Sequence, residues 1–149
     1  MIDMEALTLL QDKSTNAEIL DELSTHEDQF VRVRVAAHPN TSAQTLIKLS
    51  EDESEYVREF VAEHHNTPVD ILVKLSEDTL VVYWVAGNKN TPTDILERFS
   101  KHEDENVRAS VAVNPSTPAS ILEILSSDEN EDVRAAVAKN PATANIAQA

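Results

Sequence analysis

The chain has 149 residues, of which 27 are acidic and 12 basic, and its formal net charge is −15. This length fits one domain, and the 4% aromatic content predicts a core of Val, Ile, Leu and Ala. The acidic excess speaks against direct binding to nucleic acid or membrane, because neutralising phosphates needs clustered Lys and Arg. The absence of cysteine excludes disulfides and thiolate metal sites. No stretch has the roughly 18 apolar residues of a membrane span, so we expect a cytoplasmic protein without a cofactor.

Residues 1–14 predict a capping half-repeat that covers the apolar end of the stack behind it. Leu7, Leu9 and Leu10 supply the apolar side chains for this cover. From residue 15 onward the chain repeats itself, and successive members of a threonine series lie 26, 26, 24, 26 and 26 residues apart. The threonines are Thr15, Thr41, Thr67, Thr91, Thr117 and Thr143. A fixed period of this length indicates an array of stacked units.

Each unit contains the signals for two short helices, which we call helix A and helix B. Helix A is predicted to begin at a capping residue three positions before a valine, at Asp28, Ser54, Asp78, Asp104 and Asn130. It is predicted to end after about ten residues, at residue types that tolerate the left-handed conformation. These residues are His38, His64, Asn88, Asn114 and Asn140.

Helix B is predicted to open at the threonine series. Pro68, Pro92 and Pro118 would then occupy its first position, with an acidic residue or glutamine three residues after the threonine as a capping box. Each helix B carries an apolar stripe with the pattern Leu-x-x-Leu or Leu-x-x-Phe. Helices this short are marginal alone in water, so the units must gain their stability from stacking.

The pattern VRxxVA…NPxTPxxxLxxLS, present in five units, resembles the leucine-rich repeat variant family. The resemblance covers residues 15–143 and implies an all-α, right-handed superhelical solenoid with a general architecture like that of HEAT repeats. It further implies that helix B is short and sometimes 3₁₀. That family can carry a cysteine-rich iron–sulfur segment, which this chain lacks, so no redox role is transferred. Residues 144–149 are too few for a second helix B stripe, and we expect a frayed or truncated end there.

A basic residue follows the first valine of helix A in four units, at Arg32, Arg58, Arg108 and Arg134. This position falls on the inner side of the helix, where an unpaired charge is costly. We therefore expect each guanidinium to contact a carboxylate or capping oxygen of a neighbouring unit. The alternative interpretation is that these arginines bind an anionic ligand.

Acidic residues gather in the loops between helix B of one unit and helix A of the next. Stacking would align them on one edge, represented by Glu103, Asp104, Glu105, Asp128 and Glu131. The edge is explained either as a solvated row of loops or as a surface that attracts a basic partner. Asp128, Asn130 and Asp132 resemble the start of a calcium loop, but Val133 replaces the required glycine, so we predict no metal site.

The third repeat departs from the pattern at several positions together. It is two residues shorter, Val82 replaces the arginine, and Gly87 is the only glycine of the chain. Five of the six aromatic residues lie on helix A of the first three repeats, where the pattern reserves no core position for them. They are Phe30, Tyr56, Phe60, Tyr83 and Trp84. They predict either an apolar contact surface or repacking around the short loop.

No phosphate loop, nucleophile elbow or zinc-binding motif is present in the sequence. We therefore predict a non-enzymatic, monomeric module that binds a protein partner through the aromatic residues, and the acidic edge favours a basic partner. One alternative is a nucleic-acid mimic or electrostatic decoy acting through the acidic edge. A remote alternative is an enzyme working in a concave groove.

Overall fold

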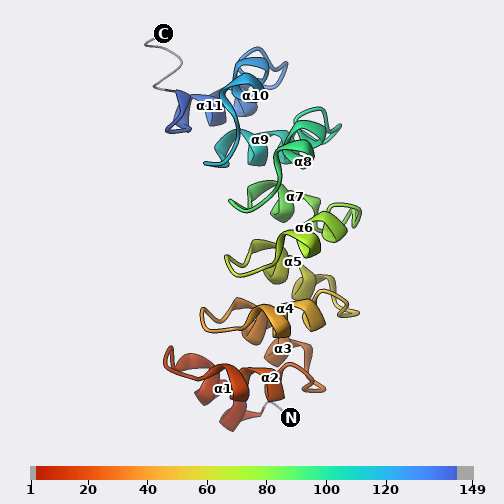
Figure 1. Ribbon diagram of the computed structural model, residues 1–149, viewed down its shortest axis with the longest axis vertical. Coiled ribbons are helices and arrows are strands. Elements are labelled where there is room, and N and C mark those ends of the chain that lie inside the picture. Colours follow the sequence, from red (N-terminus) through yellow and green to blue (C-terminus); the bar gives the residue numbers. More distant parts are fainter. Residues whose placement is uncertain (1–2, 144–149) are drawn as a thin grey trace.

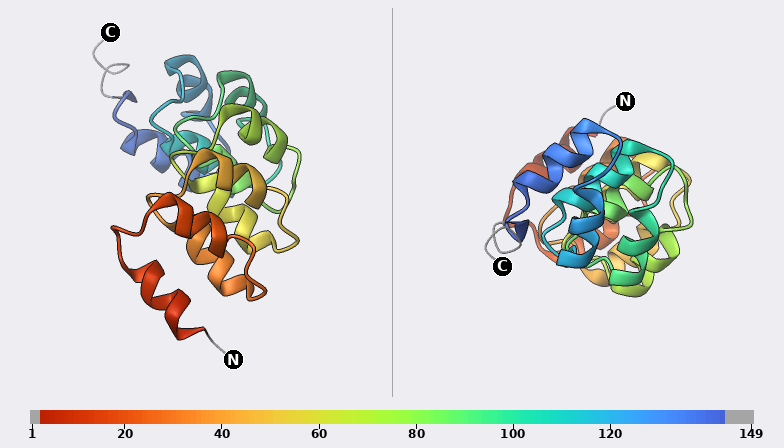
Figure 2. Two further views of the ribbon diagram at one scale, coloured as in Figure 1. Left: turned by 60° about the horizontal axis from the view of Figure 1, so that its bottom comes forward. Right: turned by 90° about the horizontal axis from the view of Figure 1, so that it is seen from above.

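The computed structural model describes residues 3–143, and every regular element within them is a helix. The helices form a column that runs from the N-terminal to the C-terminal end of the chain (Figure 1). Seen from above, successive repeats overlap one another around this column (Figure 2). The described residues thus confirm the predicted fold class, an all-α helical repeat solenoid.

Helix A and helix B alternate along the column. The A helices are α1 (Met4–Gln11), α3 (Gln29–Ala37), α5 (Glu55–Glu63), α7 (Val82–Gly87), α9 (Glu105–Val113) and α11 (Glu131–Lys139). The B helices are α2 (Ala17–Leu23), α4 (Ala43–Leu49), α6 (Val69–Leu75), α8 (Thr93–Phe99) and α10 (Ala119–Leu125). All five B helices are seven-residue α-helices, so the 3₁₀ alternative is wrong for this chain.

The core is a continuous aliphatic layer between the two rows of helices. Each B helix contributes one leucine whose exposed fraction is 0%. These leucines are Leu20, Leu46, Leu72, Leu96 and Leu122. The two valines and the alanine of the first four repeats are likewise buried, whereas in the last repeat Val133 and Val137 are buried and Ala138 is exposed. Burial of a leucine or valine side chain contributes roughly 1.5–3 kcal/mol, which compensates for the low stability of such short helices.

The A helices pack along the stack against one another, from α1 on α3 to α9 on α11. The B helices instead pack mainly on the A helices beside them. The A helices are thus the more closely packed of the two rows. Side chains that point away from the core on successive A helices therefore lie on one extended face.

Most predicted N-caps of helix A are correct, but the third is wrong. Asp28, Asp104 and Asn130 each accept a hydrogen bond from an N–H of the first turn, whereas Ser54 occupies the cap without such a bond. In the third repeat the cap is Val81 instead of Asp78, and α7 has six residues where its neighbours have nine. Asp78 lies twenty residues after Arg58, the spacing of Asp52 and Asp128 from their arginines, so it occupies the pairing position. The two-residue deletion falls between Asp78 and Val81, where the other repeats have their capping residue.

The predicted left-handed ends of helix A are also wrong. The C-cap residues have φ between −74° and −64° and ψ between 122° and 133°, which is extended backbone. No residue in the described range has a positive φ. The His and Asn side chains at these positions have a different task, described below.

The threonine series does not cap helix B as predicted. Each threonine hydroxyl donates backward to the carbonyl oxygen of the residue six positions earlier, which is near the end of helix A. The N-cap of helix B is the following residue, so that Pro68, Pro92 and Pro118 are caps and do not occupy the first helical position. The buried hydroxyl satisfies a carbonyl that the end of an α-helix leaves open.

Candidate functional site

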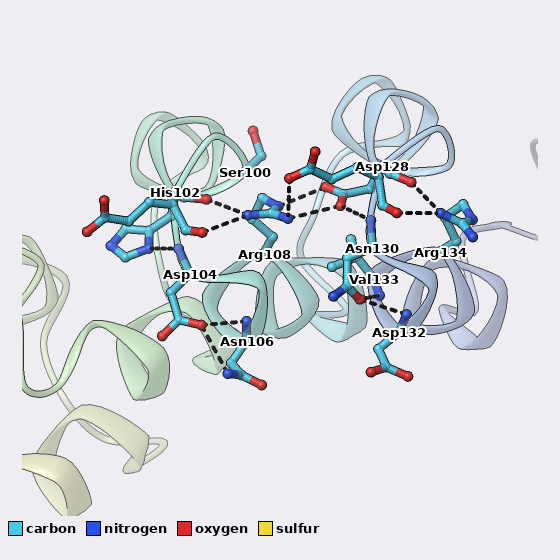
Figure 3. Close-up of polar contacts among 12 residues, drawn as sticks. Ser100, His102, Asp104, Asn106, Arg108, Asp128, Asn130, Asp132, Val133 and Arg134 are labelled. Atoms are coloured by element: carbon cyan, nitrogen blue, oxygen red, sulfur yellow. Dashed lines mark hydrogen bonds and ion pairs between the residues drawn. The ribbon is translucent and has the colours of Figure 1, made fainter.

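Arginines on three A helices bind an aspartate that lies twenty residues later, in the next repeat. Arg108 donates from Nε to Asp128 Oδ2 at 2.8 Å and from Nη2 to Oδ1 at 3.1 Å (Figure 3). Arg32 makes the same two-bonded contact with Asp52, at 2.7 and 3.0 Å. Parallel pairs of this kind combine charge attraction with a fixed geometry.

The same guanidinium groups also bind the loop of their own repeat. Arg108 Nη1 donates to the carbonyl oxygens of His102 and Glu103 at 2.8 and 3.1 Å, as Figure 3 shows. The hydrogen bond from Arg108 lowers the pKa of Asp128, and the same hydrogen bond raises the pKa of Arg108. Both partners therefore remain charged, and each arginine joins two consecutive loops.

The second and last arginines depart from this arrangement. Arg58 makes a single bond to its aspartate, from Nε to Asp78 Oδ2 at 2.8 Å. Asp78 therefore binds the arginine of the preceding repeat while its own helix lacks a polar cap. Arg134 donates to the carbonyl oxygens of Asp128 and Glu129 and has no carboxylate partner among the described residues.

The residue types at the two pairing positions change together within this chain. The repeat with Val82 in place of arginine is followed by His102 in place of aspartate. Helix α1 has Ala6 at the arginine position, and twenty residues later the next loop has His26 in place of aspartate. Aspartate thus follows an arginine, and histidine follows an apolar residue, which indicates that each pair forms one unit.

A second row of contacts, which sequence reasoning missed, joins the C-caps of the A helices. His64 Nε2 lies 2.9 Å from the carbonyl oxygen of His38 and Nδ1 accepts from Asn66 N at 3.0 Å. In later repeats Asn114 Nδ2 donates to the carbonyl oxygens of Ala86 and Asn88 at 2.8 and 2.9 Å. We call this row the cap ladder, formed by His38, His64, Asn88, Asn114 and Asn140.

The cap ladder is buried, and burial has a consequence for its histidines. His64 is 6% exposed and stacks on His65 with ring centroids 4.6 Å apart. Its Nδ1 accepts from a backbone N–H, so the neutral ring carries its proton on Nε2 and donates it across the repeat boundary. Desolvation by burial lowers the pKa of His64. The sequence signal for this ladder was the recurrence of His or Asn, but not glycine, at one position.

The predicted acidic edge is partly occupied by these contacts. Glu103, Asp104, Glu105 and Glu131 are exposed. Asp128, by contrast, has a side chain that is 9% exposed and belongs to the pair with Arg108. Asp128 was therefore wrongly assigned to the free edge, because the sequence alone does not distinguish a paired aspartate from its exposed neighbours.

The predicted aromatic residues lie on the A helices of the first three repeats and are largely exposed. The exposed fraction is 69% for Phe30, 55% for Tyr56 and 44% for Tyr83. Leu80 occupies in the third repeat the position of Phe30 and Tyr56 and is 57% exposed. We call this surface the apolar face, and its members are Phe30, Tyr56, Phe60, Leu80, Tyr83 and Trp84. Only Trp84 among them also packs against the core.

Two shallow hollows lie beside the apolar face, and Glu63 lines both. The first has a volume of about 330 Å³ and is lined by Phe60, His64 and His65 together with the end of α3. The second has a volume of about 210 Å³ and is lined by Tyr83, Trp84 and residues of α9. Sequence reasoning found the aromatic side chains but not Glu63, because its position differs in residue type in every repeat.

Residues 3–143 contain no group of three or more His, Asp or Glu side chains placed to hold a metal ion. None of their helices is long and apolar enough to cross a membrane. The chain matches no family model, no curated protein and no solved structure. The resemblance to the leucine-rich repeat variant family therefore rests on the repeat pattern alone.

Proposed function

We propose that the chain is a non-enzymatic, cytoplasmic module that binds a protein partner through the apolar face. The observation that carries the proposal is the exposure of large apolar side chains at one recurring position of the first three repeats. Phe30, Tyr56 and Leu80 stand there, and each is more than half exposed. Contiguous exposed apolar groups with aromatic members are typical of protein interfaces.

The last two repeats provide an internal reference for this interpretation. At the position of Tyr56 they have Asn106 and Asp132, and the repeats still stack with the same buried valines. The fold thus does not require an apolar residue at this position. An apolar residue there in three consecutive repeats is explained by contact with another molecule.

The charge of the chain indicates which partners fit the apolar face. The net charge is −15, and Glu55, Glu59 and Glu63 lie on α5 together with the two aromatic residues of that helix. A partner segment with apolar anchors and basic residues between them would be attracted and oriented by these carboxylates. The exposed members of the acidic edge add to the same attraction.

The proposal is tested by site-specific crosslinking followed by affinity measurement. A photoreactive phenylalanine analogue is placed at position 56 and, as a control, at Ile124, which is 62% exposed on the other row of helices. A partner crosslinked only from position 56 is then purified. We expect Tyr56→Ser to weaken its binding by roughly tenfold or more, and Ile124→Ser to leave it unchanged. Equal effects of the two substitutions would contradict the proposal.

Salt dependence distinguishes this function from an electrostatic decoy. A decoy acting through carboxylates alone would lose its partner at high ionic strength and would tolerate Tyr56→Ser. Binding through the apolar face predicts the opposite order of sensitivity. The same purified partner serves for both measurements.

A further inference from the structure

The smaller of the two hollows combines aromatic rings with a carboxylate. Tyr83 and Trp84 meet edge to face, with ring centroids 5.1 Å apart and planes at 87°. Glu63 lines the hollow from the end of α5, Gly87 and Asn88 line it from the end of α7, and Ser110 and Val113 line it from α9. The aromatic rings and the carboxylate thus come from two consecutive A helices.

The carboxylate of Glu63 is unpaired in the described part of the chain. Its side chain is exposed and makes no ion pair or side-chain hydrogen bond within residues 3–143. Glu51 and Glu77, by contrast, form ion pairs with Lys74 and Arg98. A carboxylate beside the faces of aromatic rings attracts a cation, because the rings carry partial negative charge on their faces.

Three residues that line this hollow are among those that distinguish the third repeat. Tyr83, Trp84 and Gly87 belong to the same short helix, and the other full repeats have Ala37, Glu63, Val113 and Lys139 at the position of Gly87. A Cβ atom at Gly87 would lie 3.0 Å from the hydroxyl of Ser110. That hydroxyl donates to the carbonyl oxygen of Tyr83 at 3.0 Å. Glycine at this position therefore allows Ser110 of α9 to pack closely against α7 beside the hollow.

We propose that the hollow between Glu63, Tyr83 and Trp84 binds a cationic side chain, arginine or lysine, of the protein partner. The inference rests on the proposed function and specifies the chemistry of one contact within it. The cation would lie against the aromatic rings with the Glu63 carboxylate as its counter-ion. A neutral side chain of equal size would gain only the apolar contact.

The chain offers a direct optical measurement, because Trp84 is its only tryptophan. The fluorescence of Trp84 is titrated with N-acetyl-arginine amide, N-acetyl-lysine amide and the neutral isostere N-acetyl-citrulline amide. Such small probes bind weakly, so the titration extends to about 100 mM at constant ionic strength. We expect a saturable change with at least one of the two cationic probes and a linear, non-saturating change with citrulline. The same response to all three probes would overturn the inference.

Charge removal at two matched positions completes the test. Glu63→Gln is expected to weaken binding of the cationic probe by roughly tenfold, because it removes the counter-ion but keeps the shape. Glu123→Gln removes an exposed carboxylate from α10 and is expected to have no effect. Both sites are exposed, so circular dichroism should show both variants folded. An unchanged affinity in Glu63→Gln would overturn the inference.

The outcome is separable from that of the proposed function. If the purified partner is lost by Tyr56→Ser but retained fully by Glu63→Gln, the cation site is wrong while the apolar face stands. If the cationic probe binds but the partner is unaffected by Tyr56→Ser, the cation site stands and the apolar face is wrong.

Discussion

The first three repeats and the last two have the same interior and different surfaces. Val31 and Val107 are both 1% exposed, and Leu46 and Leu122 are both fully buried. On the outer side of helix A, however, the early repeats expose Phe30 and Tyr56, whereas the late repeats have Asn106 and Asp132 at that position. The fold therefore requires the buried valines and leucines, whereas it accepts either apolar or polar residues at the exposed position of helix A.

Among the contacts between repeats, one kind is the same in the early and late repeats and another kind differs. The Arg108–Asp128 pair near the C-terminal end matches the Arg32–Asp52 pair near the N-terminal end in partners and geometry. The cap ladder, in contrast, uses His38 and His64 early in the chain and Asn in the later repeats. Both residue types donate to the same class of carbonyl, but only histidine can be titrated near neutral pH.

The largest effect should follow from breaking one of the matched pairs. Asp128→Asn leaves the guanidinium of Arg108, whose side chain is 10% exposed, without its counter-ion. We expect a loss of about 3 kcal/mol in the free energy of unfolding, measured by urea titration. The pKa of Asp128 is lowered by its hydrogen bond with Arg108, so this contribution is present above about pH 4 and lost as the pH falls.

The control for this prediction lies beside the pair. Glu129 is 93% exposed and its carboxylate is 3.9 Å from Arg108. Glu129→Gln should therefore change the free energy of unfolding by no more than about 0.5 kcal/mol. If the two substitutions lowered the free energy of unfolding equally, the prediction that the buried Arg108–Asp128 pair stabilises the fold would be contradicted.

A smaller effect should follow from restoring the pair where the chain lacks it. Val82→Arg alone places a charge at a position that is 8% exposed and should destabilise the fold. His102→Asp supplies the missing carboxylate, so the double variant should be more stable than the sum of the single effects predicts. We expect a favourable coupling of about 1–3 kcal/mol in a double-mutant cycle based on urea unfolding. Additive effects would mean that the paired changes of residue type have another origin.

The histidine half of the cap ladder predicts a modest acid sensitivity. The pKa of His64 is lowered by burial, so the unfolded chain binds more protons as the pH falls below about 6.5, and stability decreases with falling pH there. Asparagine makes the same contact in later repeats without titrating. His64→Asn should therefore reduce the loss of unfolding free energy between pH 7 and pH 5, by about 1 kcal/mol or less.

The exposed neighbour His65 provides the control for that measurement. Its ring stacks on that of His64 but makes no hydrogen bond across the repeat boundary in the described contacts, where only its carbonyl oxygen accepts from Asn90, a bond that the substitution keeps. His65→Asn should leave the pH dependence of unfolding in place. If both substitutions reduced the pH dependence of unfolding equally, the acid sensitivity could not be assigned to His64.

The sequence predicted the repeat, both helices and the buried stripe, because periodic apolar residues report directly on packing. It also predicted that the inner arginines contact neighbouring loops, since a charge at that position needs a partner. The prediction failed where the same residue type can either cap the helix that follows it or bind a preceding segment. The threonines, predicted to open helix B, bind the end of helix A instead. Asp78, predicted to cap α7, occupies the position that pairs with the arginine of the preceding repeat.

The remaining failures concern contacts between residues about 26 positions apart. The cap ladder joins His64 to His38 and Asn114 to Asn88, and neither partner is recognisable from its own repeat. The hollow at Glu63 likewise combines the end of α5 with α7 and α9. Predicting such sites requires the register between repeats, which helix signals alone do not give.

The central claim is that the apolar face serves contact with another molecule and not the fold. It is tested most directly by the urea midpoint of the triple variant Phe30→Asn, Tyr56→Asn, Leu80→Asn, which gives the early repeats the polar surface of the late ones. We predict a free energy of unfolding within about 0.5 kcal/mol per substitution of the parent chain. A loss of several kcal/mol would show that these side chains stabilise the stack, and would contradict the account.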